Sequence, residues 1–187
     1  MVAQQRILTL AFLRSNPEDH WINRLTARVS AHPFCHVELF FESIGESFSV
    51  MWGETAGFRS KNLSNPNYEL VSLLVTQKEY DASLEFCRTA SKHALRFDDH
   101  GMWLSWCAPA NPCCGACDSS SSVKGITFCS KIITEALQFA GVREVETLRP
   151  SAATPSRLYS CVRHSTRMAC SSVPFKRQAF IMLSSMH

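Results

Sequence analysis

The sequence lacks any long apolar run. None of its apolar stretches approaches the roughly 20 residues that a helix needs to cross a bilayer, and the first 13 residues lack the apolar core and small-residue cleavage site of a secretory signal. The charge is also close to balance, because 19 Lys and Arg face 16 Asp and Glu. A surplus this small does not indicate nucleic-acid binding. We therefore expect an intracellular, cytoplasmic protein with no nucleic-acid partner and no stable membrane insertion.

A regular cysteine spacing is missing as well. The chain has nine cysteines, an odd number, and their spacing is irregular. A chain of 187 residues is long enough to build an apolar core and does not need disulfide bonds to hold it together. These features favour reduced thiols in a reducing compartment.

The length and the 45% of apolar residues predict one folded domain. We place it at residues 1–162, including a loop at 107–124 that is rich in Cys and Ser. Residues 163–187 are Ser-rich and basic, and we expect them to form a flexible tail. Its segment from Phe175 to Leu183 is the one part of the tail that could associate with a membrane.

Local patterns predict the order of the elements. We expect strands at 6–13, 34–42, 47–52 and 68–75, of which the second and third form a hairpin. A first helix should begin with Asn16 as its cap and Pro17 in its first turn, with Trp21, Leu25 and Val29 on its buried side. The sequence Thr76-Gln-Lys-Glu79 is a capping box, which predicts a second helix from there to about residue 93.

His36 and Glu38 are the first pair of residues that could carry chemistry. Residues two apart in a strand point to the same side, so the imidazole of His36 and the carboxylate of Glu38 should lie together. A carboxylate beside an imidazole can fix its tautomer and stabilise its protonated form. The alternative is that both residues belong to the solvated side of a half-covered strand.

Cys129 lies where an apolar strand, Gly125-Ile-Thr-Phe, gives way to a helix that runs to about Gly141. A thiol in the first turn of a helix is close to unpaired N–H groups and to the positive end of the helix dipole, which both favour the thiolate. A nearby neutral imidazole could complete a nucleophile and base pair. Against this, a free cysteine is often a small core residue.

Together, the two features resemble a known arrangement. The segment Cys35-His36-Val37-Glu38-Leu39-Phe40 is similar to the histidine motif of the circularly permuted NlpC-like branch of the papain-like cysteine peptidase superfamily. Its cysteine motif looks like Phe128-Cys129-Ser130-Lys131-Ile132-Ile133. Two further segments are similar to uncharacterised viral and eukaryotic members, Asn65-Pro66-Asn67-Tyr68-Glu69 and Thr154-Pro155-Ser156-Arg157-Leu158-Tyr159.

This resemblance implies an α+β, papain-like fold in which a small antiparallel sheet packs against helices and Cys129 begins a helix. It implies a cysteine-dependent hydrolase that cleaves a peptide or isopeptide bond in a protein or peptide substrate. Cys129 would be the nucleophile and His36 the base. The third catalytic residue would be Glu38, with Ser47 or Ser49 on the following strand as alternatives.

Other interpretations of the same sequence remain open. A lipid acyltransferase of the lecithin:retinol acyltransferase-like type would use the same residues, and a catalytically silent binding protein could retain them. We predict no cofactor and no bound metal. Zinc is weakly indicated because Cys114 and Cys117 form one Cys-x-x-Cys, but Cys107 and Cys113 do not supply a second.

Overall fold

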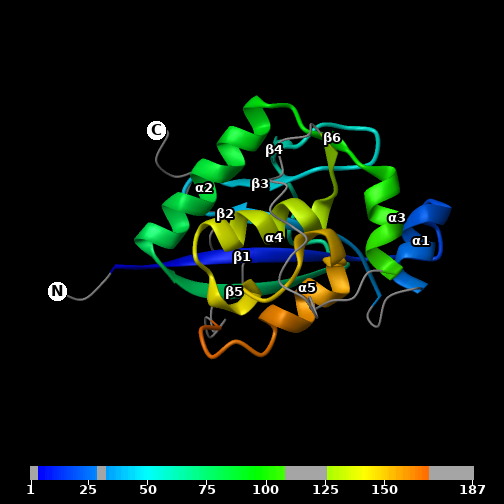
Figure 1. Ribbon diagram of the computed structural model, residues 1–187. Coiled ribbons are helices and arrows are strands. Elements are labelled where there is room, and N and C mark those ends of the chain that lie inside the picture. Colours follow the sequence, from blue (N-terminus) through cyan, green and yellow to red (C-terminus); the bar gives the residue numbers. More distant parts are fainter. Residues whose placement is uncertain (1–3, 29–32, 108–125, 169–187) are drawn as a thin grey trace, which may run out of the picture.

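The computed structural model describes residues 4–28, 33–107 and 126–168. In these ranges the chain forms one main sheet with helices packed against it (Figure 1). The predicted α+β class with an antiparallel sheet is therefore confirmed, as is the prediction that Cys129 begins a helix. Of the helices described, none combines the length and the apolar character that a bilayer-spanning segment requires.

The main sheet has five antiparallel strands in the order β4-β3-β2-β1-β5. Their bounds are β1 Gln5–Arg14, β2 Phe34–Phe41, β3 Glu46–Ser49, β4 Gly57–Arg59 and β5 Tyr68–Thr76. The four predicted strands are thus confirmed, with the third ending earlier than expected. Two short strands, β6 (Arg96–Phe97) and β7 (Ile126–Thr127), pair in parallel as a second sheet.

Five α-helices are present in the described residues. They are α1 Trp21–Arg28, α2 Gln77–Lys92, α3 Asp99–Cys107, α4 Cys129–Phe139 and α5 Pro155–Val162, and two 3₁₀ turns lie at Arg143–Val145 and Pro150–Ala152. The helices α2, α4 and α5 lie against the sheet, whereas α1 and α3 gather at one end of the molecule (Figure 1).

The predicted capping box at the start of α2 is confirmed. The Thr76 hydroxyl accepts a hydrogen bond from the Glu79 N–H at 3.2 Å, and the Thr76 N–H donates to Glu79 Oε2 at 2.6 Å. Two of the N–H groups that a helix start leaves unpaired are satisfied in this way.

The prediction for the first helix is wrong about its start and its buried side. The Asp19 carboxylate accepts a hydrogen bond from the Asn16 N–H at 2.8 Å, and this closes a separate turn before the helix begins at Trp21. Ile22 and Thr26 are the buried residues of α1, while Trp21 remains 53% exposed. The buried stripe is therefore displaced by one residue from the predicted one.

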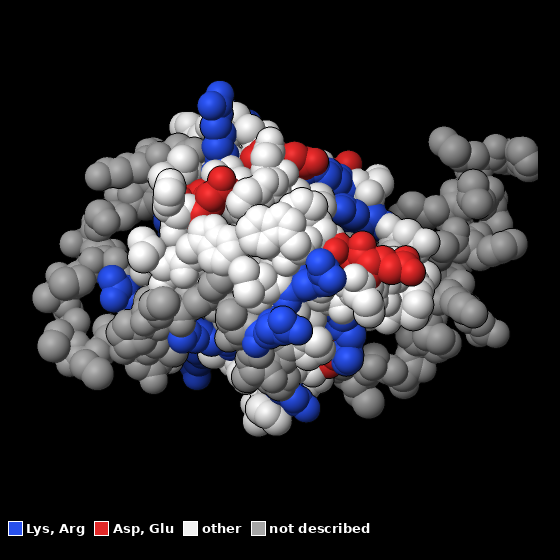
Figure 2. Space-filling model, turned by 90° about the vertical axis from the view of Figure 1, so that its right-hand side faces the viewer, with Lys and Arg blue, Asp and Glu red and all other residues white. Residues whose placement is uncertain are grey.

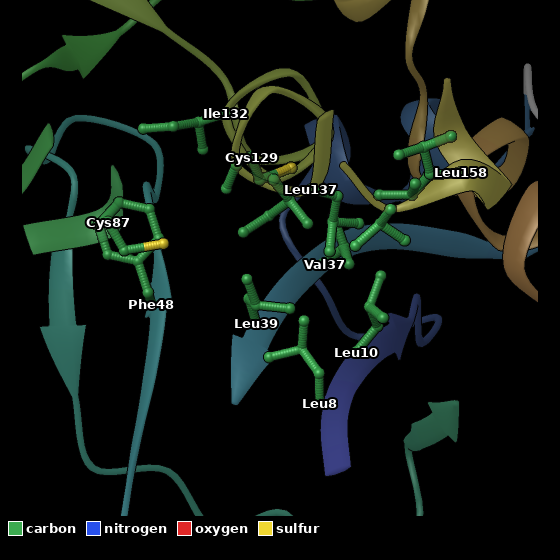
Figure 3. Close-up of a cluster of buried hydrophobic side chains, with 14 of the residues drawn as sticks. Leu8, Leu10, Val37, Leu39, Phe48, Cys87, Cys129, Ile132, Leu137 and Leu158 are labelled. Atoms are coloured by element: carbon green, nitrogen blue, oxygen red, sulfur yellow. The ribbon is translucent and has the colours of Figure 1, made fainter. Parts of the chain in front are cut away.

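The core lies between one face of the sheet and the helices. Alternate residues of each strand supply it, as the leucines Leu8 and Leu10 of β1 and Val37 and Leu39 of β2 show (Figure 3). From α4, Ile132 and Leu137 pack onto them.

The C-terminal residues of the described range are fixed to the sheet. The carbonyl of Arg167 accepts a hydrogen bond from the Leu74 N–H at 2.7 Å, and its guanidinium contacts Glu79 at 2.7 Å. The predicted flexible tail stays a prediction for residues 169–187, which lie outside the described residues together with the segment Phe175 to Leu183 and most of the loop at 107–124.

Candidate functional site

Cys129 is the first residue of α4, as the sequence predicts. Phe128 precedes it in an extended conformation, and its backbone carbonyl accepts the first helical hydrogen bond from Ile132 N–H at 3.0 Å. The next residue, Ser130, is fixed by a hydrogen bond from its hydroxyl to the Ala153 carbonyl at 2.5 Å. Hydrogen bonds of Phe128 and Ser130, the residues before and after Cys129, therefore fix the start of the helix that carries the thiol.

The backbone groups of Val37 in β2 lie where the pairing of β2 with β3 has ended. The backbone pairing between β2 and β3 begins at Leu39, which is opposite Phe48. In an antiparallel strand, alternate residues direct their N–H and C=O toward the same neighbour, so those of Val37 point to the same side as those of Leu39. The Ser49 hydroxyl donates a hydrogen bond to the Val37 carbonyl at 2.9 Å. The Val37 N–H acts to lower the pKa of the Cys129 thiol, against the larger effect of burial.

The same hydroxyl contacts the predicted base. His36 Nε2 lies 3.2 Å from Ser49 Oγ and 3.6 Å from Glu38 Oε1. Ser49 has one hydroxyl proton and uses it on the Val37 carbonyl, which can only accept. Ser49 Oγ must therefore accept from His36, which places the ring proton on Nε2 and leaves the lone pair on Nδ1. The neutral imidazole is thus in a form that can take a proton at Nδ1.

Glu38 is almost completely buried, with 1% of its surface exposed. Its Oε1 accepts a hydrogen bond from the Tyr68 hydroxyl at 2.9 Å and lies 3.4 Å from the ammonium of Lys61. Burial, followed by the charge of Glu38, raises the pKa of Tyr68 well above its usual value, so this hydroxyl keeps its proton and stays a donor. A buried charge needs such partners to be tolerated.

Both members of the predicted pair are neutral at pH 7. Burial lowers the pKa of His36 to about 4, against an opposing effect of Glu38. Burial also raises the pKa of Cys129 to about 11, although the N–H groups of Val37 and Ser130 act in the other direction. The N–H groups at the helix start thus act toward the thiolate, as expected, but desolvation of the charged sulfur outweighs them and the thiol stays protonated.

The structure distinguishes between the two serines considered for the third position. The Ser49 hydroxyl contacts His36, whereas the Ser47 hydroxyl is buried and has no hydrogen-bond partner among the described residues. Glu38 lies near the same ring nitrogen as Ser49. The imidazole therefore has two polar neighbours at Nε2, one neutral and one charged.

Lys61 and Tyr68 were not among the predicted site residues. Tyr68 does fall within the segment Asn65 to Glu69, which carries part of the family resemblance. The other such segment has a structural role, since the Thr154 hydroxyl caps α5 by accepting from the Arg157 N–H at 3.2 Å and the Tyr159 ring packs edge-on against Phe12.

For a metal, the described residues contain no group of three His, Cys, Asp or Glu side chains able to hold an ion. Cys113, Cys114 and Cys117 lie outside the described ranges. The prediction that these cysteines bind no metal is therefore not tested by the structure.

No protein-family model, no curated protein and no solved structure matches the chain.

Proposed function

We propose that the protein is a cysteine-dependent hydrolase that cleaves a peptide or isopeptide bond, with Cys129 as nucleophile and His36 as base. The observation that carries this proposal is the set of interactions around Val37 in β2. The Ser49 hydroxyl donates to the Val37 carbonyl and also contacts the ring of His36, the chain neighbour of Val37. The Val37 N–H acts to lower the pKa of the Cys129 thiol. Two segments that are distant in the sequence thus meet at one position.

The neutral state of the two groups is compatible with this chemistry. The mechanism requires Nδ1 of His36 to come within hydrogen-bond reach of the Cys129 sulfur. As the sulfur attacks the substrate carbonyl carbon, its proton then passes to Nδ1, so that no free thiolate has to exist in the buried site. The imidazolium formed in this step is stabilised by the carboxylate of Glu38. The backbone N–H of Cys129, at the start of α4, is available to donate to the developing oxyanion.

The cycle then closes without a cofactor. The tetrahedral intermediate collapses, the C–N bond breaks, and the proton on His36 passes to the departing amine, which leaves an acyl thioester on Cys129. A water molecule gives a proton back to His36 as it attacks the thioester. The acid is released and the thiol of Cys129 is restored.

The proposal is tested with an activated ester, because the natural substrate is not needed to acylate the thiol. The protein is treated with p-nitrophenyl acetate, and the acetyl adduct is located by mass spectrometry and its formation rate measured. We expect one adduct on Cys129 and a rate that falls about 100-fold or more in His36→Gln, as removal of a general base predicts.

Cys161→Ala is the matched control, since Cys161 is also a free cysteine and is partly exposed. This variant should acylate at the wild-type rate, whereas Cys129→Ala should lose the adduct. An adduct that persists unchanged in Cys129→Ala would refute the proposal. Absence of any adduct on Cys129 in the wild-type protein would do the same and would favour a silent binding protein.

A further inference from the structure

Helix α1 carries a second stripe of side chains that points away from the sheet. Trp21, Arg24, Leu25 and Arg28 follow one another at the spacing of a single helix face, and together they line a hollow of about 330 Å³. The buried residues of the helix, Ile22 and Thr26, lie on another side.

Helix α3 extends the apolar part of this stripe. The ring of Trp103 stacks on Trp21 with centroids 6.2 Å apart and an angle of 22° between the planes. The following residue, Leu104, is 69% exposed, and Trp21 is 53% exposed. Large apolar side chains that stay exposed next to one another commonly mark an interaction site.

The basic part of the stripe is available for an acidic ligand. The Arg24 guanidinium makes one long contact of 3.5 Å with the Pro17 carbonyl, and Arg28 lies in the last turn of α1. Within residues 4–28, 33–107 and 126–168, neither guanidinium takes part in an ion pair. An arginine of this kind can bind a carboxylate through two parallel hydrogen bonds.

This surface lies at the end of the molecule where α4 begins. The Asp98 N–H, just before α3, donates to the Thr127 carbonyl at 2.6 Å, two residues ahead of Cys129. Helix α1 packs on β2, the strand of His36. Figure 2 looks onto this end of the molecule, where uncharged side chains cross the middle of the surface. Basic side chains lie beside and below them, and acidic side chains lie above them and at the right.

We propose that the α1–α3 surface, made of Trp21, Arg24, Leu25, Arg28, Trp103 and Leu104, binds an acidic peptide segment that also carries apolar side chains. This proposal rests on the proposed hydrolase function, because the segment is taken to be the part of the substrate next to the bond that Cys129 attacks. The two guanidinium groups bind carboxylates of the segment, and the tryptophan and leucine side chains bind its apolar residues. A hollow on the surface suits a peptide side chain better than it suits the plane of a membrane.

The test measures binding and not turnover, so that it stays separate from the hydrolase proposal. A fluorescein-labelled peptide of alternating Glu and Leu is titrated with the Cys129→Ala protein, and fluorescence anisotropy gives the dissociation constant. The same peptide with Gln in place of Glu is the ligand control. We expect the acidic peptide to bind at least about 10-fold more tightly, with an affinity that falls as salt is raised.

The matched protein variants change equal charge on two helices. Arg24→Glu with Arg28→Glu should weaken binding about 10-fold or more. Arg88→Glu with Lys92→Glu, at the same spacing on the exposed side of α2, should change it less than about 2-fold, because exposed charges at a distance are screened. Trp21→Ala should weaken binding by about 5-fold. Thermal melting of each variant shows whether it folds.

Equal weakening in the two charge-reversed pairs would overturn the proposal, as would equal affinity for the Glu and Gln peptides. Binding to vesicles of anionic phospholipid without binding to the acidic peptide would also overturn it, in favour of a membrane contact. Loss of acylation at Cys129 with intact peptide binding would count against the hydrolase function alone.

Discussion

Cys129 and His36 are buried to the same degree but in different surroundings. Their exposed fractions are 6% and 8%. The Cys129 sulfur belongs to the apolar core with Val37 and Leu39 (Figure 3), whereas the His36 ring contacts Ser49 and Glu38. Burial favours the neutral form of both groups. They differ in the part that each can take in a proton transfer. The polar neighbours of the imidazole stabilise the tautomer that can accept a proton. The apolar neighbours of the thiol do not stabilise a thiolate, so the thiol needs the imidazole as its proton acceptor.

The polar surroundings of His36 need more compensating interactions than the apolar surroundings of Cys129. A buried carboxylate is unfavourable unless hydrogen bonds and an opposite charge compensate it, and Tyr68 and Lys61 do so for Glu38. The core around Cys129 needs only well-packed apolar side chains. Substitutions should therefore damage the two sides to different degrees.

Removal of the buried carboxylate is expected to have the largest effect. Glu38→Leu leaves the Tyr68 hydroxyl and the Lys61 ammonium without their partner, and we expect it to lower the free energy of unfolding by roughly 3 to 5 kcal/mol. Urea unfolding at pH 7 measures this value. Glu54→Leu is the control, because Glu54 pairs with Arg59 at 2.5 Å but is 49% exposed, and such a pair contributes at most about 1 kcal/mol. Similar losses in both variants would contradict the role assigned to Glu38.

The pH dependence of stability should differ between the wild-type protein and His36→Gln. The pKa of His36 is lowered from 6.5 to about 4 in the folded protein, so between these values the unfolded chain binds a proton that the folded protein does not. Stability therefore falls as the pH drops through this window. Relative to His36→Gln, the wild-type protein should lose about 3 kcal/mol of unfolding free energy between pH 7 and pH 4.

The difference between the two proteins is the quantity to measure, by urea unfolding at several pH values. Burial also raises the pKa of Glu135 to about 7, which makes stability fall as the pH rises from 4.5 to 7. This opposite trend is common to both proteins and cancels in the difference. If the wild-type protein and His36→Gln show parallel pH profiles, the imidazole is not held neutral by burial.

Local signals predicted the parts of the fold that short segments determine. The capping box from Thr76 to Glu79 specified the start of α2, and Cys129 was placed correctly at a strand-to-helix junction. The start of α1 was missed because the Asp19 N–H donates to the Asn16 carbonyl in a separate turn, and the first helical hydrogen bond runs from the Arg24 N–H to the His20 carbonyl.

The partners of Glu38 could not be predicted in the same way. Tyr68 lies on β5 and Glu38 on β2, with β1 between the two strands, so their contact depends on the register of two separate strand pairs. Lys61 lies outside the strands altogether. Neither spacing nor periodicity specifies such contacts, whereas His36 and Glu38 share a strand and were paired from the sequence alone.

The smallest expected effects come from substitution of the two serines of β3. Ser49→Ala removes the group that fixes the tautomer of His36 and leaves the Val37 carbonyl without its side-chain donor, so we expect a loss of about 1.5 kcal/mol in unfolding free energy. Ser47→Ala removes a buried hydroxyl that has no partner among the described residues, and it should cost less than about 0.5 kcal/mol. Nitrogen-15 chemical shifts of the His36 ring should show the proton on Nε2 in the wild-type protein and in Ser47→Ala, and a mixture of tautomers in Ser49→Ala. A ring proton on Nδ1 in the wild-type protein would contradict the proposed role of His36, because the nitrogen assigned to receive the Cys129 proton would already carry one.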